Sequence, residues 1–283
     1  HLINAGVAQP LVTLLCRGGA KGQARAAETL GYLVRRRPGL VAVPSVLPSL
    51  LTTLRGSDPD GKAAAASLIA EFSRATANHA AILRAGTLHY MLVLLKGRDA
   101  LASVHAARAL AFLAPAPELR GTIDAMGALP ALVAALRGGG SDLHAWAALA
   151  LRNLANESEK FRKSIGEKGA IPLLVAQLRH TSCDGSAASA AALKELASVS
   201  DLRETLLEAN AVSALEDSLR REDCSKAGAC CALDALRLLG RDDESLAAVA
   251  HTVVTRQRDE HGDGEVGSLL DALVAAGDQL EKL

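Results

Sequence analysis

The sequence predicts an all-α protein built from stacked helical repeats. Of its 283 residues, 49% are apolar but only 2% are aromatic, so the core must be built from Ala, Leu and Val. Ala is the best helix former, whereas aromatic and β-branched residues are typical of strands. A short pattern also returns along the chain about every 41 residues, which is typical of a solenoid.

Each repeat contains a corner residue that is followed by a Leu-rich segment. Five corners are clear in the sequence: Gly6, Gly86, Gly127, Gly169 and Asn210. The last four are separated by 41, 42 and 41 residues. The first gap is 80 residues, so a sixth copy is expected near Ser45, ahead of the segment Val46–Leu54. The spacing therefore predicts six repeats, with corners near residues 6, 45, 86, 127, 169 and 210.

An Ala- and Leu-rich run lies about 20 residues after each corner. Its apolar residues recur at i, i+3, i+4 and i+7, which is helical periodicity. The runs are Ala24–Val34, Ala63–Phe72, Val104–Ala114, Leu143–Ala155, Ala187–Ala197 and Ala227–Leu239. Gly-rich stretches such as Arg17–Gly19 separate this run from the preceding segment, and a short turn such as Arg120–Met126 precedes the corner. Each repeat thus combines a short helix with two longer ones.

Backbone geometry explains why the corner is usually Gly. A short helix ends there and a longer one leaves at a steep angle, so the backbone needs a positive φ or a close approach. Asn210 suits this role because Asn tolerates the left-handed region. Ser45 suits it less, so the second repeat is expected to turn differently. Pro48, Pro130 and Pro172 follow three residues later, in the first helical turn, where Pro costs no hydrogen bond.

Two segments carry the most characteristic pattern: Gly169–Leu178, which reads GAIPLLVAQL, and Ala148–Ala155, which reads ALALRNLA. They resemble the two signature halves of an armadillo repeat, and the resemblance covers roughly residues 1–240. HEAT repeats are the alternative, but their two-helix unit lacks the short helix and Gly corner. The resemblance implies three helices per repeat, stacked into a right-handed superhelix whose third helices line a concave groove.

The resemblance also implies which residues contact a partner. In the armadillo family an Asn of the third helix often holds the backbone of an extended peptide, and only Asn153 matches that position. The equivalent positions of other repeats, and residues one or two helical turns before them, complete a row on the same face. The predicted partner-binding residues are Arg25, Glu28, Tyr32, Glu71, His105, Arg108, Phe112, Trp146, Leu149, Asn153 and Glu195.

Roles within this row follow from side-chain chemistry. Tyr32, Phe112 and Trp146 would supply apolar contacts, while Glu71 and Glu195 would favour basic side chains of the partner. The alternative is that the aromatic residues belong to the core, since large apolar side chains at helical spacing are often buried.

No catalytic, cofactor-binding or metal site is predicted. Gly56–Ala63 is like a phosphate loop, but it ends in Ala and contains two aspartates. Gly262–Gly267 fits G-x-G-x-x-G by letters only, and the acidic run Asp259–Glu265 is interpreted as a solvated loop. The 31 basic and 31 acidic residues balance, which disfavours nucleic-acid binding.

The five cysteines form no C-x-x-C pair, which favours a reducing compartment. We expect the cytoplasm, with the nucleus or a large intracellular assembly as alternatives. No apolar run is long enough to span a membrane. The chain opens without Met, in the middle of the repeat pattern, which indicates a trimmed chain and leaves peripheral membrane association through upstream residues open.

After the repeats of residues 1–240, residues 241–283 are predicted to form two capping helices with a polar linker near 259–264. The alternative is that the last helix docks in the groove or on a partner.

We therefore expect a non-catalytic scaffold or adaptor that binds an extended segment or helix of a partner protein along the groove. A structural subunit fixed in a large multiprotein assembly is the first alternative. A nuclear-import-type receptor is a second, disfavoured because Leu149 stands where that pattern has Trp. A third is an enzyme or ligase module without its catalytic domain.

Overall fold

The repeat pattern of the sequence becomes a succession of helices in the computed structural model, which describes residues 6–56, 58–180, 182–221 and 225–240. These ranges contain sixteen α-helices, one 3-10 turn and no strand. The chain divides into two compact units, residues 1–150 and 151–283, and the boundary lies within α10 (Ser141–Ala155). The predicted cap over residues 241–283, with its linker near 259–264, lies outside the described residues.

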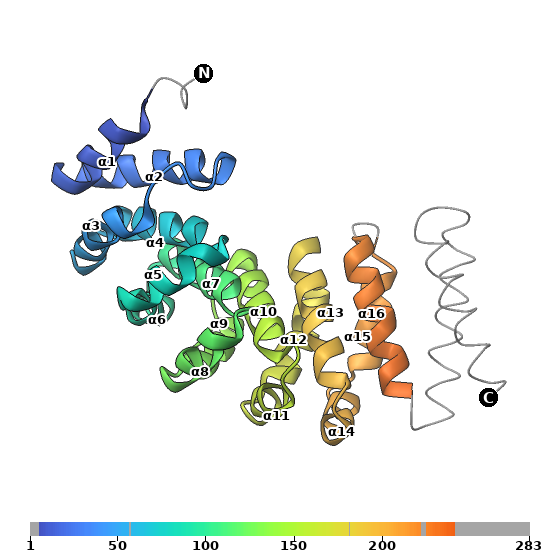
Figure 1. Cartoon of the computed structure of the whole chain (residues 1–283). Helices are drawn as coiled ribbons and strands as arrows, with labels where there is room; N and C mark the ends of the chain where they lie inside the picture. Colours follow the sequence, from blue (N-terminus) through green and yellow to red (C-terminus); the bar gives the residue numbers. More distant parts are fainter. Residues whose placement is uncertain (1–5, 57, 181, 222–224, 241–283) are drawn as a thin grey trace. The chain divides into compact units, whose positions relative to one another are not determined.

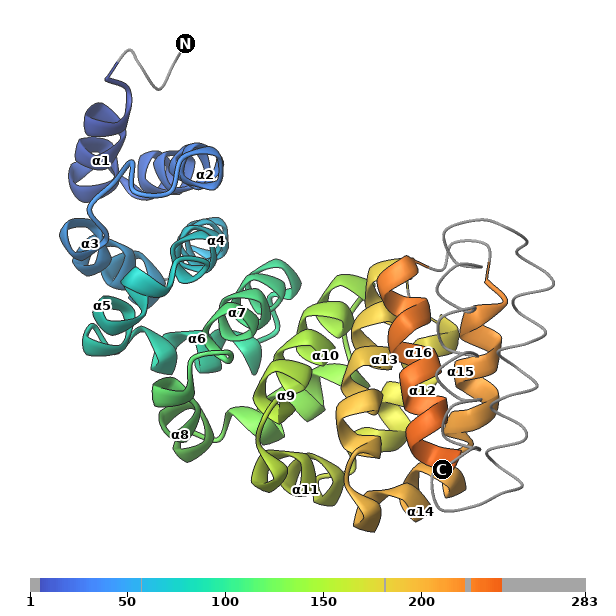
Figure 2. The same cartoon turned by 45° about the vertical axis from the view of Figure 1, so that its right-hand side comes forward.

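In its described residues, unit 1 contains nine complete helices, a 3-10 turn and the start of α10. They are α1 (Ala8–Arg17), α2 (Ala20–Arg36), α3 (Val43–Arg55), α4 (Pro59–Ser73), η1 (Thr76–Asn78), α5 (His79–Arg84), α6 (Thr87–Leu95), α7 (Ala100–Leu113), α8 (Pro117–Ala125) and α9 (Ala128–Arg137). The long helices α2, α4 and α7 pack side by side, and α1, α3 and α6 each pack on the long helix that follows (Figures 1 and 2). We call α2, α4, α7 and α10 the third helices of their repeats.

Small and aliphatic side chains build the core of unit 1, as composition predicts. Almost the whole length of α4 is buried, including the four consecutive alanines Ala63–Ala66. Leu30 of α2 and Leu68 of α4 are fully buried. Transfer of each such leucine from water stabilises the fold by roughly 2 kcal/mol. The alanines leave room for neighbouring helices to approach closely, which places the third helices in a row.

The corners behave as their residue types require. A positive φ between +57° and +76° occurs at Gly6, Gly86, Gly127, Gly169 and Asn210. The predicted left-handed corner is therefore confirmed at these five positions. Gly86, Gly127, Gly169 and Asn210 each immediately precede a helix, such as α6 after Gly86, whereas α1 begins two residues after Gly6.

The second repeat turns differently, as expected from Ser45. Ser45 lies inside α3, and the positive φ of this region is at Gly39, six residues earlier in the chain. The expected place of Pro48 in the first turn is wrong, because α3 begins at Val43 and Pro48 is interior to it. Since Pro48 has no N–H, the carbonyl of Pro44 lacks its helical donor, and Pro44 itself lies at an exposed position.

Unit 2 repeats the same plan. It contains the end of α10, followed by α11 (Glu159–Glu167), α12 (Ala170–His180), α13 (Cys183–Ala197), α14 (Ser200–Glu208), α15 (Ala211–Leu219) and α16 (Lys226–Leu239). We call α13 and α16 the third helices of unit 2; they pack along each other, and α12 and α15 pack on them in turn. Figure 2 shows α13 and α16 side by side.

Hydropathy and length give one further result. Within the described ranges, no single helix is long and apolar enough to cross a membrane. The pair α8 and α9, bent by 76°, passes the same test of length and composition only when its two helices are taken together.

Candidate partner-binding surface

The third helices of unit 1 carry most of the predicted row. On α2, Arg25, Glu28 and Tyr32 are exposed, and Tyr32 keeps 73% of its surface open to solvent. The alternative that Tyr32 belongs to the core is therefore wrong. Arg25 Nη1 donates to Glu28 Oε2 at 2.8 Å, so these two charges balance each other on the surface.

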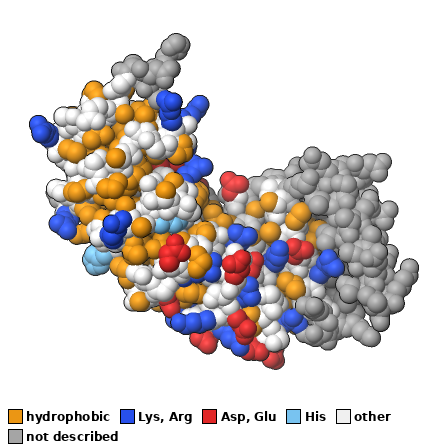
Figure 3. Space-filling view, in the orientation of Figure 1, with side chains coloured by type: hydrophobic (Ala, Val, Ile, Leu, Met, Phe, Trp, Pro, Cys, Tyr) orange, Lys and Arg blue, Asp and Glu red, His pale blue; other side chains and the backbone are white. Residues whose placement is uncertain are grey.

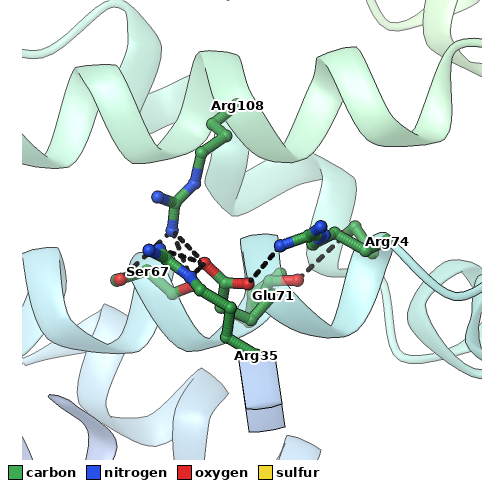
Figure 4. A network of polar contacts seen from close by, with 7 residues as sticks. Arg35, Ser67, Glu71, Arg74 and Arg108 are labelled. Atoms are coloured by element: carbon green, nitrogen blue, oxygen red, sulfur yellow. Dashed lines mark hydrogen bonds and ion pairs between the residues drawn. The ribbon is translucent and has the colours of Figure 1, made fainter. Parts of the chain in front are cut away.

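Glu71 of α4 lies at the centre of an arginine cluster, which consists of Arg35, Glu71, Arg74 and Arg108. Its Oε1 accepts from Arg35 Nε at 3.0 Å and from Arg35 Nη2 at 2.6 Å, and Arg108 Nη2 lies 3.1 Å away. Its Oε2 lies 3.5 Å from Arg74 Nη1. Figure 4 shows Arg35 of α2, Arg74, which directly follows α4, and Arg108 of α7 pointing toward this one carboxylate.

This geometry corrects the expectation that Glu71 attracts basic side chains of a partner. The Glu71 side chain is only 2% exposed and already lies among three guanidinium groups. A carboxylate buried in this way needs such partners, because an unpaired buried charge is very costly. Three positive charges against one negative charge leave the cluster with a net charge of +2.

Arg108 is the most buried arginine of the cluster. Its Nη2 also lies 3.3 Å from both the carbonyl oxygen and Oγ of Ser67, while its Nε is buried without a hydrogen-bond partner. Burial lowers the pKa of Arg108, and the neighbouring Glu71 charge opposes that shift. On Arg35 the hydrogen bond to Glu71 dominates and raises the pKa. Both remain cationic at neutral pH.

His105 lies one helical turn before Arg108 on α7. Burial, followed by the charge of Arg108, lowers the pKa of His105 to about 4. Its imidazole is therefore neutral at pH 7 and leaves the net charge of the cluster unchanged.

An aromatic pair adjoins the arginine cluster. Phe112 of α7 and Trp146 of α10 meet edge to face, with ring centroids 5.5 Å apart and planes at 63°. The Arg74 guanidinium carbon lies 5.6 Å from the Phe112 centroid, and that of Arg108 lies 6.0 Å from the Trp146 centroid. Both rings are partly exposed, as is Leu149. They are neither core residues nor free surface residues.

Asn153 and Glu195 belong to unit 2. Asn153 of α10 is partly exposed, and its Oδ1 accepts from Arg152 Nη1 at 3.0 Å. Glu195 of α13 accepts from Arg162 Nη2 of α11 at 3.2 Å, and its side chain is only 14% exposed. Because Glu195 already pairs with Arg162, the expectation that it attracts a partner's basic side chains is corrected as well.

Sequence reasoning missed Arg35 and Arg74. Each lies three residues after a member of the predicted row, Tyr32 and Glu71 respectively. Residues three apart on a helix are neighbours, so this spacing was the available signal. It would have placed two further cations on the same face.

The surfaces of the two units differ in chemistry. Figure 3 shows hydrophobic side chains gathered over the N-terminal helices of unit 1, while acidic and basic side chains intermingle over the helices of unit 2. Leu14, Tyr32, Val93 and Leu101 are the large hydrophobic residues of the described ranges that remain exposed, and all lie in unit 1. Within these ranges, no group of three His, Cys, Asp or Glu residues could hold a metal ion.

Solved structures share the fold. An engineered protein is 26% identical over 83% of this chain and 98% of its own, with a TM-score of 0.76. A designed armadillo repeat protein in complex with the peptide (KR)4 is 21% identical over 81% of this chain and 98% of its own, with a TM-score of 0.71. A third structure concerns a phosphorylation switch in the interaction between cadherin and β-catenin. It is 20% identical over 88% of this chain and 48% of its own, with a TM-score of 0.71.

No family model and no curated protein matches the chain. The structural likenesses agree with the features of the chain itself, namely the left-handed corners, the short helices that precede them and the paired long helices. The chain is therefore an all-α solenoid with the armadillo-repeat fold.

Proposed function

We propose that this protein is a non-catalytic scaffold or adaptor that binds an extended segment or helix of another protein through its third helices. The observation that carries the proposal is the aromatic pair Phe112 and Trp146, which stays partly exposed and bordered by arginines. Aromatic and Arg side chains dominate the binding energy of protein interfaces. One structural neighbour holds a peptide, and another concerns the contact of cadherin with β-catenin.

In unit 1, Tyr32 and the aromatic pair would supply apolar contact area. These side chains are suited to that role because aromatic rings bury a large area while losing little conformational freedom. In unit 2, the partly exposed Asn153 would bond the backbone of the partner. We place this activity in the cytoplasm, where the free thiols of Cys16, Cys230 and Cys231 would stay reduced.

A comparison of variants tests the proposal. Trp146→Ala combined with Asn153→Ala is expected to lower the affinity for a native partner at least about tenfold, or about 1.4 kcal/mol, without loss of helicity. Partners are cross-linked in native extract and identified by mass spectrometry, and the affinity of each purified partner is then measured. Circular dichroism checks the fold.

Val93→Ala is the matched control, because Val93 is 54% exposed in unit 1 but lies on α6 and not on a third helix. Partners kept by the control and lost by the double variant would support binding through the third helices. Partners bound equally by wild type and the double variant would contradict it, and would favour a structural subunit held by another surface.

A further inference from the structure

We propose that the partner segment is acidic and that its carboxylate side chains bind the arginine cluster of unit 1. This inference rests on the proposed function and names the chemistry of the partner. It reverses the expectation that the face selects basic side chains, since the acid on which that expectation depended is buried.

The charges of this face do not cancel. Arg35, Arg74 and Arg108 surround the single carboxylate of Glu71, which leaves a net charge of +2. Elsewhere on α2, Arg25 and Glu28 form a balanced pair. Two carboxylates of an incoming segment would neutralise the excess.

The cluster is built in two layers. Arg108 and Glu71 form its buried base, with side chains that are 11% and 2% exposed. Arg35 and Arg74 form its outer layer, with side chains that are 49% and 51% exposed. The base holds the outer guanidinium groups in place, while their exposure makes them accessible to a partner.

The outer arginines retain donors for a new acceptor. Arg35 uses Nε and Nη2 on Glu71, and Arg74 uses only Nη1. Among the described residues, Nη1 of Arg35 and both Nε and Nη2 of Arg74 have no protein acceptor. Guanidinium groups bind carboxylates through paired, charge-assisted hydrogen bonds, which are stronger than those between neutral groups.

The aromatic pair defines what accompanies the acid. Because the Arg74 guanidinium lies over the Phe112 ring, a carboxylate on Arg74 would bring adjacent residues of the segment near Phe112 and Trp146. The face therefore fits a segment in which acidic residues are followed or preceded by an apolar one.

Two peptides of equal length and opposite charge test the sign of the preference: (Asp-Glu)4 and (Lys-Arg)4. Each carries a fluorescent label, and its affinity for the whole chain is measured by anisotropy at several salt concentrations. We expect (Asp-Glu)4 to bind at least about tenfold more tightly than (Lys-Arg)4, with an affinity that falls as salt rises. This comparison of the two peptides requires only the wild-type protein.

Variants then locate the site. The double variant Arg35→Gln with Arg74→Gln leaves the buried base intact. It is expected to lower the affinity for (Asp-Glu)4 at least about tenfold. Glu71→Gln raises the net charge of the cluster and is expected to strengthen the binding of (Asp-Glu)4. Arg84→Gln is the matched control, because Arg84 is an exposed arginine of unit 1 whose Nε contacts only the carbonyl of Ala80 in its own helix. It is expected to change the affinity less than about twofold.

Failure of (Asp-Glu)4 to bind, preference for (Lys-Arg)4, or an equal loss in Arg84→Gln would each overturn the inference. The proposed function fails separately, when native partners bind the Trp146 and Asn153 double variant as they bind wild type. A native partner that is lost from the double variant can still bind wild type through a basic segment. That result would support the proposed function and contradict only the inference that the segment is acidic.

Discussion

Glu71 in unit 1 and Glu195 in unit 2 occupy equivalent repeat positions but have different surroundings. Glu71 lies among three arginines, two of which come from the neighbouring third helices α2 and α7. Glu195 receives Arg162 from the short helix α11 that follows its neighbouring third helix. The repeat position therefore decides where a side chain lies, while the adjacent repeats decide the net charge around it.

The largest expected effect comes from removing the buried arginine. Arg108→Met should lower the free energy of unfolding by about 3 kcal/mol, because Glu71 loses its most buried partner. Arg162→Met should cost about 1 kcal/mol, since one pair is lost at a more accessible site. Urea unfolding of both variants measures the difference, and equal losses would contradict the comparison.

Acid should destabilise unit 1 through His105. Its folded pKa of about 4 lies below the ordinary value of 6.5, so the neutral form is favoured by folding. The stability it contributes is present above pH 6.5 and is lost as the pH falls toward 4. Allowing for solvent screening, the loss is about 2 kcal/mol.

His105→Gln removes the titrating group while keeping a polar side chain. The groups around His105 that shift its pKa are Arg108, Glu71, Arg35 and Asp99. Thermal unfolding between pH 7 and pH 4 should therefore show a smaller decline for the variant than for wild type. An identical decline would exclude His105 as the cause.

Substitutions at the corners should change the free energy of unfolding by a smaller amount, through backbone conformation only. Gly127→Ala should cost about 1–2 kcal/mol, because φ is +76° there and L residues disfavour that conformation. A Cβ at Gly127 would meet no atom within 4 Å, so sterics from neighbours do not contribute. Asn210→Gly, at a corner with φ +57°, should instead be neutral or slightly stabilising. Chemical unfolding distinguishes the two signs.

The smallest effect on stability is expected at Tyr32. Because this side chain is 73% exposed, Tyr32→Ala should change the free energy of unfolding by less than about 0.5 kcal/mol. Phe112→Ala removes a ring that contacts Trp146 and Arg74, and should cost about 1–2 kcal/mol. A comparable loss at both positions, measured by calorimetry, would show that Tyr32 packs more extensively than its exposure indicates.

Local rules were sufficient for most of the fold. Helical periodicity predicted the six long runs, and all of them lie on the third helices of the structure. Gly and Asn corners were predictable because a positive φ depends on the residue that adopts it. Pro48 was misplaced, since the start of α3 depends on how Val43, Val46 and Leu47 are buried and not on the Gly spacing.

The sequence by itself therefore determined the fold class, the repeat length and the helix face on which the site residues lie. These depend on spacing and on backbone preferences, which act over a few residues. The tertiary structure alone decided that Glu71 is buried and that Arg35, Arg74 and Arg108 give its surroundings a positive charge. Arg35 and Arg108 lie 36 and 37 residues from Glu71 in the chain, so their contact exists only once adjacent repeats have stacked.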